Sequence, residues 1–131
     1  MTVIKSFALP RVFKTAWFSK NAAKVGIIDK ELCDAAKELS QGLWDADLGG
    51  KLYKKRLNGN RHRSIVITKT DTYWIFNYLF SKSERENISI DELKAFKKLA
   101  KDYQTLDDKS MTVLLKYNDL VEICNDYSKK I

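Results

Sequence analysis

The sequence predicts an α+β domain, in which helices pack on a small antiparallel β-sheet, and three observations carry this prediction. The segment 73–80 is apolar on both of its alternating faces, which is typical of a central strand covered on both sides. Two further strands are expected at 51–57 and 62–70, and the short connections between the three favour antiparallel pairing. Apolar stripes with helical spacing lie before and after these strands, so helices are available to cover the sheet.

Length and charge restrict the class of protein. The 131 residues are expected to form a single domain, 1–131, because domains of this kind cluster at about 100–150 residues. Apolar residues make up 44% of the chain, which is enough for a core. The net charge of +7 favours an anionic partner, and RNA, DNA and an acidic protein all remain open.

Cysteine usage and hydropathy indicate the compartment. Cys33 and Cys124 are far apart in the sequence and are interpreted as small buried thiols in a reducing compartment. The chain has one histidine and no zinc-ligand spacing, so no metal and no cofactor is expected. The first ten residues lack the apolar segment of a signal peptide, and no run approaches the roughly 20 apolar residues of a membrane span. We therefore expect a cytoplasmic protein without membrane contact.

The first part of the chain predicts one strand and two helices. Alternation over 11–17 favours a first strand, after an extension 1–10 that ends at Pro10. Ser19 can cap a short helix over 20–25, which Gly26 ends. Asp29 can cap a second helix, which stops at Gly42. Its apolar stripe consists of Leu32, Ala35, Ala36 and Leu39. The segment 43–48 is expected to be a loop, with Trp44 folded onto the core.

The last part predicts two helices and a strand. Ser89 and Glu92 have the spacing of a capping box, and Ile88 and Leu93 that of a hydrophobic staple. The buried stripe of this helix is Leu93, Phe96, Leu99, Ala100 and Tyr103, and four lysines (94, 97, 98 and 101) lie on its other side. Asp107 or Asp108 can start a short helix with Met111, Leu114 and Leu115 facing inward. Residues 120–124 alternate as a last strand, and the polar tail 125–131 is expected to fray.

The most basic stretch of the chain runs along the first of the three middle strands. Between Lys51 and Arg63 there are six Lys or Arg side chains and no carboxylate. Strand alternation places Lys54 and Arg56 on one face and Lys55 on the other. Like charges side by side on a sheet repel, and a polyphosphate backbone would relieve that repulsion. The alternative is a solvated edge strand whose lysines prevent aggregation.

Several segments, in their order and spacing, together resemble the RelE/HigB superfamily of bacterial toxins, most closely the HigB-like branch carried by type II toxin–antitoxin modules. They are Phe13-Lys14-Thr15 with Trp17-Phe18, Ala46-Asp47-Leu48-Gly49-Gly50, Tyr53-Lys54-Lys55-Arg56-Leu57, Phe80-Ser81-Lys82-Ser83-Glu84-Arg85-Glu86-Asn87-Ile88, and 93–101. The resemblance covers a core of about 11–104 and leaves 1–10 and 105–131 as extensions.

The resemblance implies a RelE-like fold, with two N-terminal helices packed on a small antiparallel sheet and a C-terminal helix. It also implies ribosome-dependent cleavage of mRNA in the decoding site, and a cognate antitoxin that often carries a helix-turn-helix. The chain departs from the pattern at 58–62, where relatives usually have a longer glycine-rich basic loop. Arg63 takes the place of the arginine expected after that loop.

Cleavage of RNA without added water requires a base for the 2′-OH, stabilisation of the phosphorane charge and an acid for the 5′ oxygen. A two-metal route needs clustered carboxylates, but Asp71 is the one acid between residues 50 and 81. A two-histidine route is excluded because His62 is alone. A cationic site remains, in which a lysine can also transfer a proton and Glu84 is a candidate base or orienting group.

The candidate catalytic residues are Lys54, Arg56, Arg63, Lys82 and Arg85. Lys54 and Arg56 would bind or polarise the scissile phosphate, Arg63 would stabilise the transition state, and Lys82 with Arg85 would complete the site. Candidate contacts to mRNA or the ribosome are Lys51, Lys55, Arg61, His62, Lys94 and Lys98.

Other interpretations stay open for single residues and for the whole chain. Arg85 could instead pair with Glu84 or Glu86, and His62 could be an ordinary loop residue. Tyr53 and Tyr78 are interpreted as core residues rather than as base-stacking ones. Two rival functions also remain: a gyrase poison of the same fold, and a basic nucleic-acid-binding module without catalysis.

Overall fold

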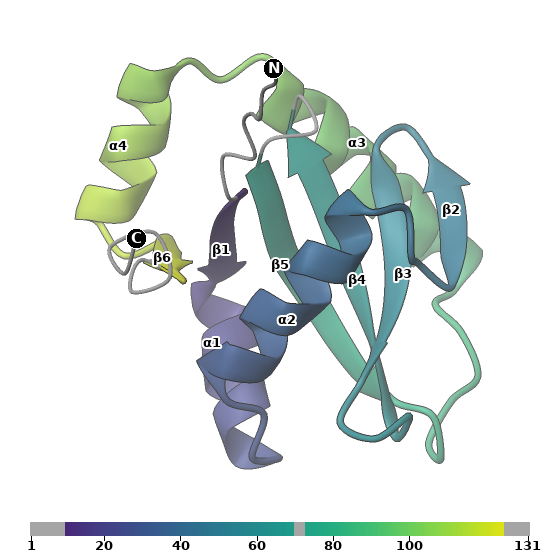
Figure 1. The fold of residues 1–131 in the computed structure, drawn as a ribbon. Coiled ribbons are helices and arrows are strands. Elements are labelled where there is room, and N and C mark those ends of the chain that lie inside the picture. The colour runs from purple at the N-terminus through teal and green to yellow at the C-terminus, as the bar shows by residue number, and fades with distance from the viewer. Residues whose placement is uncertain (1–9, 70–72, 125–131) are drawn as a thin grey trace, which may run out of the picture.

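The computed structural model describes residues 10–69 and 73–124, which form a six-stranded sheet with helices on both faces (Figure 1). In chain order, the elements are β1 (Arg11–Thr15), α1 (Ala16–Lys24), α2 (Asp29–Ser40), β2 (Ala46–Gly49), β3 (Leu52–Leu57), β4 (His62–Lys69), β5 (Tyr73–Ser81), α3 (Ile90–Gln104), α4 (Asp108–Lys116) and β6 (Leu120–Ile123). The α+β prediction is therefore confirmed.

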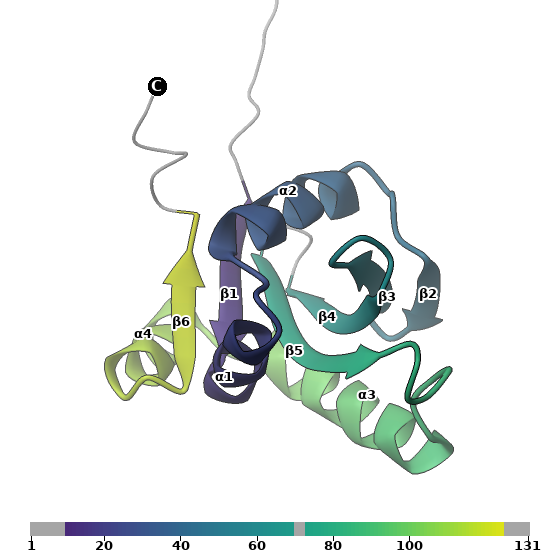
Figure 2. The same cartoon turned by 90° about the horizontal axis from the view of Figure 1, so that it is seen from below.

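Each face of the sheet has its own hydrophobic core. Residues of α1 and α2, such as Phe18 and Leu39, pack with Trp74 and Phe76 of β5 on one face. Residues of α3 and α4 pack on the other face, where Ile75 lies. Figure 2 shows α2 and α3 on opposite sides of the sheet. The family resemblance implies one C-terminal helix, whereas the residue pattern predicts two helices after the middle strands, and the second face does carry both α3 and α4.

The strand order is β2-β3-β4-β5-β1-β6. The pairs from β2 to β5 are antiparallel, as predicted, and β6 pairs with β1 in the same way. The exception is β1, which runs parallel to β5. A parallel neighbour requires a long crossover, and here the crossover contains both N-terminal helices and three strands. The prediction of an all-antiparallel sheet is wrong at this one pair.

The strand β5 is central, as its two apolar faces predicted. It pairs with β4 on one side and β1 on the other, and most of its side chains are buried. The edge strand β2 was missed, since 43–48 was predicted to be a loop. Its four residues include a glycine and an exposed aspartate, so the short segment lacks the apolar alternation that indicates a strand. Trp44 does pack on the core, with its ring 4.5 Å from that of Tyr53.

The helix starts differ from the predictions at α1 and α2. The hydroxyl of Thr15 accepts a hydrogen bond from the N–H of Phe18 at 3.1 Å, so α1 begins at Ala16 and not after Ser19. In α2 the N-cap position is Ile28 and Asp29 is the first helical residue; its carboxylate pairs with Lys14 instead. The predicted apolar stripe of α2 is buried.

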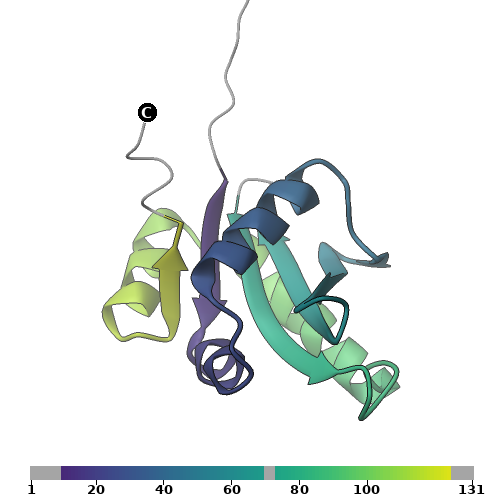
Figure 3. The same cartoon turned by 60° about the horizontal axis from the view of Figure 1, so that its bottom comes forward.

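The later helices start where the sequence indicates. The capping box of α3 is present, with Ser89 as the N-cap and Glu92 as its reciprocal partner. Asp107 caps α4, whose Met111 is buried. The strand β6 follows and lies with α4 at the β1 edge of the sheet (Figure 3). The tail 125–131, predicted to fray, lies outside the described residues.

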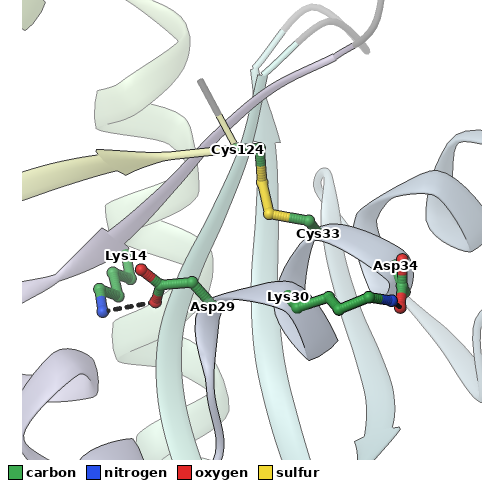
Figure 4. Close-up of a disulfide and its surroundings, with 6 residues drawn as sticks. All are labelled: Lys14, Asp29, Lys30, Cys33, Asp34 and Cys124. Atoms are coloured by element: carbon green, nitrogen blue, oxygen red, sulfur yellow. Dashed lines mark hydrogen bonds and ion pairs between the residues drawn. A yellow bond between two sulfur atoms is a disulfide. The ribbon is translucent and has the colours of Figure 1, made fainter. Parts of the chain in front are cut away.

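The two cysteines form a disulfide, which corrects their interpretation as separate buried thiols (Figure 4). Cys33 lies on α2 and Cys124 directly follows β6, with their Cα atoms 5.7 Å apart. Their separation of 91 residues in sequence hides this pairing, because it depends on β6 lying beside β1. The disulfide joins the N-terminal helices to the end of the described chain.

Candidate functional site

Two loops meet at one end of the sheet. The turn 58–61 between β3 and β4 has positive φ angles at Asn58, Gly59 and Asn60, which asparagine and glycine tolerate best. The N–H of Lys82, just after β5, donates to the carbonyl of Arg61 at 3.0 Å. The two loops form a pocket of about 430 Å³ lined by Asn60, Arg61, His62, Ser81, Lys82 and Ser83. Three of the predicted basic site residues therefore line one cavity.

A row of basic side chains crosses the sheet beside this pocket. Arg56 of β3 lies opposite Arg63 of β4, and Arg63 lies opposite Phe80 of β5. The guanidinium of Arg85 lies over the Phe80 ring, 5.6 Å from its centre. Lys54 occupies the same face of β3 two residues away, as alternation predicted, opposite Ile65. This is the face on which α3 packs.

Carboxylates from outside the basic stretch reach two of these arginines. The Nε of Arg56 donates to Asp45 Oδ1 at 2.7 Å, and its backbone N–H donates to the other carboxylate oxygen. Arg85 forms a two-bonded ion pair with Glu92 of α3. The alternatives Glu84 and Glu86 are therefore not the partners seen for Arg85. The absence of acids between Lys51 and Arg63 says little about charge pairing, because the acids come from distant elements.

Arg85 is held on every side. Its Nε donates to the carbonyl of Asn87 at 3.0 Å, and its Nη1 donates to the Tyr78 hydroxyl at 3.4 Å and to Glu92 at 3.2 Å. Its Nη2 donates to the second oxygen of Glu92. The guanidinium beside Glu92, with the N–H of Ser89, lowers the pKa of that carboxyl to about 2. Both partners are therefore charged throughout the neutral range.

Three predicted site residues have no carboxylate partner among residues 10–69 and 73–124. The Nη1 of Arg63 donates to the carbonyls of Asn60 and His62, each at 3.1 Å, which aims this nearly buried guanidinium toward the turn. The side-chain amines of Lys54 and Lys82 make no hydrogen bond or ion pair within the same ranges. Lys54 is half-buried and Lys82 is exposed. These three residues carry charge that is available to an anion.

The structure does not bring Lys55 to this site. Its side chain lies on the opposite face of β3, only 7% exposed, as part of the layer under α2. The ammonium is 2.7 Å from Glu38 and donates to the Leu43 carbonyl at 2.7 Å. A contact between Lys55 and RNA would require this buried pair to break.

The remaining predicted contacts are spread along the molecule. Lys51 precedes β3 and lies at the far end of the sheet, where its carbonyl accepts the N–H of Thr68. Lys94 and Lys98 are on the exposed side of α3, and Lys98 pairs with Asp102 at 3.2 Å. His62 lies 3.1 Å from the Asn58 amide through its Nδ1, which holds the ring against the turn.

Sequence reasoning missed two residues that hold the site together. Glu92 was found as a capping residue, but its bond to Arg85 depends on where α3 starts relative to β5. Tyr78, interpreted as a core residue, is half-buried between the rings of Trp17 and Phe96, at 4.9 and 5.4 Å. Its hydroxyl oxygen also accepts a hydrogen bond from Nη1 of Arg85. No spacing in the sequence indicates either contact.

The described part of the chain holds no cluster of three or more His, Cys, Asp and Glu side chains able to bind a metal ion. Within the same residues, no helix combines the length and the apolar character needed to cross a bilayer.

A comparison with protein families identifies the family to which this chain is similar. The model of the family described as the RelE toxin of the RelE/RelB toxin–antitoxin system matches residues 10–123, which include every candidate site residue. The match also includes α4 and β6, which lie after residue 104. No curated protein and no solved structure matches the chain.

Proposed function

Because this chain belongs to the family of RelE toxins of toxin–antitoxin systems, we propose that it is a ribosome-dependent endoribonuclease that cleaves mRNA and stops translation. It acts in the cytoplasm, where ribosomes are found, and belongs to the HigB-like branch. The observation that carries the proposal is a group of three cations, Lys54, Arg63 and Lys82, that have no carboxylate partner among the described residues and lie at and beside the hairpin end of the sheet.

Phosphate binding explains why these charges are left without carboxylates. A scissile phosphate gains negative charge in the transition state, and fixed cations stabilise that charge most where they need no rearrangement. Arg63 is already oriented by two backbone carbonyls and stabilises the transition state. Lys54 and Lys82 have free amines, which bind the phosphate oxygens and can transfer a proton. No metal ion and no cofactor takes part.

The other basic residues have supporting roles. Arg56 bonds Asp45 through Nε, which leaves its two terminal nitrogens to bind the scissile phosphate. Arg61 and His62 line the pocket beside Lys82 and bind the neighbouring nucleotide. Lys51, Lys94 and Lys98 contact ribosomal RNA at the periphery. We leave Lys55 out of the RNA-binding set, because Glu38 and the Leu43 carbonyl hold its ammonium on the other face.

The partner that controls this activity is a cognate antitoxin. A RelE toxin implies a RelB-type partner, and the resemblance to the HigB-like branch favours a helix-turn-helix protein. The antitoxin neutralises the toxin by covering the basic site or by preventing its entry into the ribosome.

The proposal is tested by mRNA cleavage in a translating extract and by growth arrest on expression. Lys54→Ala, Arg63→Ala and Lys82→Ala each remove one unpaired cation, so each should lower cleavage by about 10²-fold or more. Lys109→Ala is the matched control, because it removes an exposed charge from α4, outside the site. It should cleave like the unmodified chain.

The melting temperatures of the variants separate loss of chemistry from loss of fold. Full activity in all three site variants would overturn the proposed site. Absence of cleavage by the unmodified chain, with inhibition of gyrase supercoiling instead, would overturn the proposed reaction. Strongly salt-dependent RNA binding without any cleavage would also overturn the proposed reaction, and would indicate a nucleic-acid-binding module without catalysis.

A further inference from the structure

The turn that carries Lys82 is tied down at its start. The N–H of Lys82 donates to the Arg61 carbonyl at 3.0 Å, which holds the residue against the β3–β4 turn. The carbonyl of Ser81 accepts the N–H groups of Glu84 and Arg85, at 3.1 and 3.2 Å. Residues 81–85 therefore form one closed turn with Lys82 at its exposed side.

The end of the same turn is tied to α3 through the side chain of Arg85. A guanidinium has five N–H groups, and four of those in Arg85 are used by Asn87, Tyr78 and Glu92 within the described residues. One N–H is left, so Arg85 cannot bind a phosphate with two bonds while Glu92 holds it. Arg85 is therefore better placed to hold the turn against α3 than to bind a phosphate.

The carboxylate of Glu92, which accepts the hydrogen bonds from Arg85, is itself held in place by the start of α3. Glu92 is the third residue of α3, and its Oε1 accepts the N–H of Ser89 at 2.7 Å in the capping box. Its own N–H donates to the Ser89 hydroxyl oxygen at 3.1 Å. The carboxylate is thus fixed by the helix end before it bonds Arg85.

We propose that Glu92 is a positioning residue of the RNA-cleaving site, which acts through Arg85 to fix the turn that presents Lys82. The inference rests on the proposed function. It changes the role of Arg85 from binding the phosphate to holding the turn 81–85 against α3. Without the Glu92 carboxylate, the turn keeps its bond to Arg61 but loses its attachment to α3, and the Lys82 amine is no longer held at the phosphate. Small displacements of this kind reduce rates strongly.

Glu92→Gln tests this role, because glutamine keeps an acceptor for the Ser89 N–H but removes the charge and replaces one of the two oxygens that accept from Arg85 by an NH2 group. The measurement is single-turnover cleavage of mRNA on programmed ribosomes. The rate constant should fall about tenfold, with a change of less than about twofold in the half-saturating toxin concentration. In a Lys82→Ala background, Glu92→Gln should have no further effect on the residual rate, because the group that it positions is gone.

Two further variants complete the test. Asp91→Asn is the matched control, since it neutralises an exposed carboxylate in the same first turn of α3 and leaves the Arg85–Glu92 pair and the capping box intact; it should cleave at the unmodified rate. Arg85→Lys keeps the charge but not the two-bonded geometry, and should lose as much activity as Glu92→Gln.

An unchanged rate in Glu92→Gln, or the same fold loss with and without Lys82, would overturn the positioning role. If the unmodified chain cleaves and Glu92→Gln does too, this inference fails alone. If the unmodified chain does not cleave, the proposed function fails with it.

Discussion

At the scale of single residues, the basic side chains of this protein divide by their partners. Arg56, Lys55 and Arg85 are paired with carboxylates from elsewhere in the chain, whereas Arg63 bonds only backbone carbonyls among the described residues. A carboxylate partner offsets part of the free energy that a cation loses when it leaves water on folding. The same partner makes the cation less available to a ligand. Basic composition therefore overstates the size of the proposed site, because cations held by carboxylates, such as Lys55 and Arg85, are less available to RNA.

Lys55→Ala should reduce stability without reducing cleavage. The variant removes the nearly buried ammonium that bonds the Leu43 carbonyl and Glu38; because both of these partners lie on exposed residues, the lost hydrogen bonding should cost about 0.5–1.5 kcal/mol. The measurement is urea unfolding together with cleavage per folded molecule. Lys98→Ala is the control, because its exposed pair with Asp102 should contribute less than about 0.5 kcal/mol. Loss of cleavage in a fully stable Lys55→Ala variant would return Lys55 to the RNA-binding set.

At the scale of elements, the start of α3 joins a structural and a functional role. The same carboxylate of Glu92 caps the helix and holds the turn after β5. An N-terminal helix end is a favourable place for that charge, because the helix dipole stabilises it there. The position of Lys82 therefore depends on where α3 begins.

The Arg85–Glu92 pair should make stability depend on pH in acid. The pKa of Glu92 in the folded chain is lowered from 4.5 to about 2, mainly by the bond to Arg85. A lowered folded pKa means that the unfolded chain binds the proton first, so the stabilisation is complete above pH 4.5 and is lost as pH falls toward 2.

The measurement is the free energy of unfolding of the unmodified chain and of Glu92→Gln at neutral pH and near pH 3. The advantage of the unmodified chain should shrink in acid, and also in high salt because the pair is partly exposed. An advantage that stays constant down to pH 2 would contradict the contribution of this pair.

At the scale of the whole molecule, the end of the described chain is fastened to the sheet by two groups of contacts. Arg11 of β1 bonds Glu122 of β6 with two hydrogen bonds and also donates to the Tyr73 hydroxyl. Tyr73 in turn donates to Asp108 of α4 at 3.1 Å. The Cys33–Cys124 disulfide adds a covalent connection to α2, on the other face. α4 and β6 are therefore parts of the same folded unit.

Reduction of the disulfide should lower stability more than activity. Because the bond closes a loop of 91 residues, chain-entropy arguments give about 4–5 kcal/mol, or a fall in Tm on the order of 10 °C. Thermal unfolding with and without a dithiol reductant measures this, and a Cys33→Ser/Cys124→Ser variant should match the reduced protein. The proposed cleavage site lies on other elements, so the rate per folded molecule should be retained. Equal melting of oxidised and reduced protein would contradict a stabilising role.

Much of the fold could be predicted from patterns of residues that are close in sequence. The apolar stripes of α2 and α3, the capping box at Ser89 and the central place of β5 are decided by residues close in sequence, whose spacing can be read directly. The helix start at Thr15 was missed because Ser19 offers an equally plausible cap, and only backbone geometry selects between them. The shared face of Lys54 and Arg56 followed from strand alternation.

Contacts between distant elements could not be read in this way. Alternation along a strand shows which face of the sheet a charged side chain lies on, because it depends only on residues that are neighbours in the sequence. The choice of partner is made by packing: which helix covers that face, which strand lies beside it, and which carboxylate arrives there. Asp45 beside Arg56, Glu92 beside Arg85 and Cys124 beside Cys33 all follow from that packing, and they define which cations remain free to meet a phosphate.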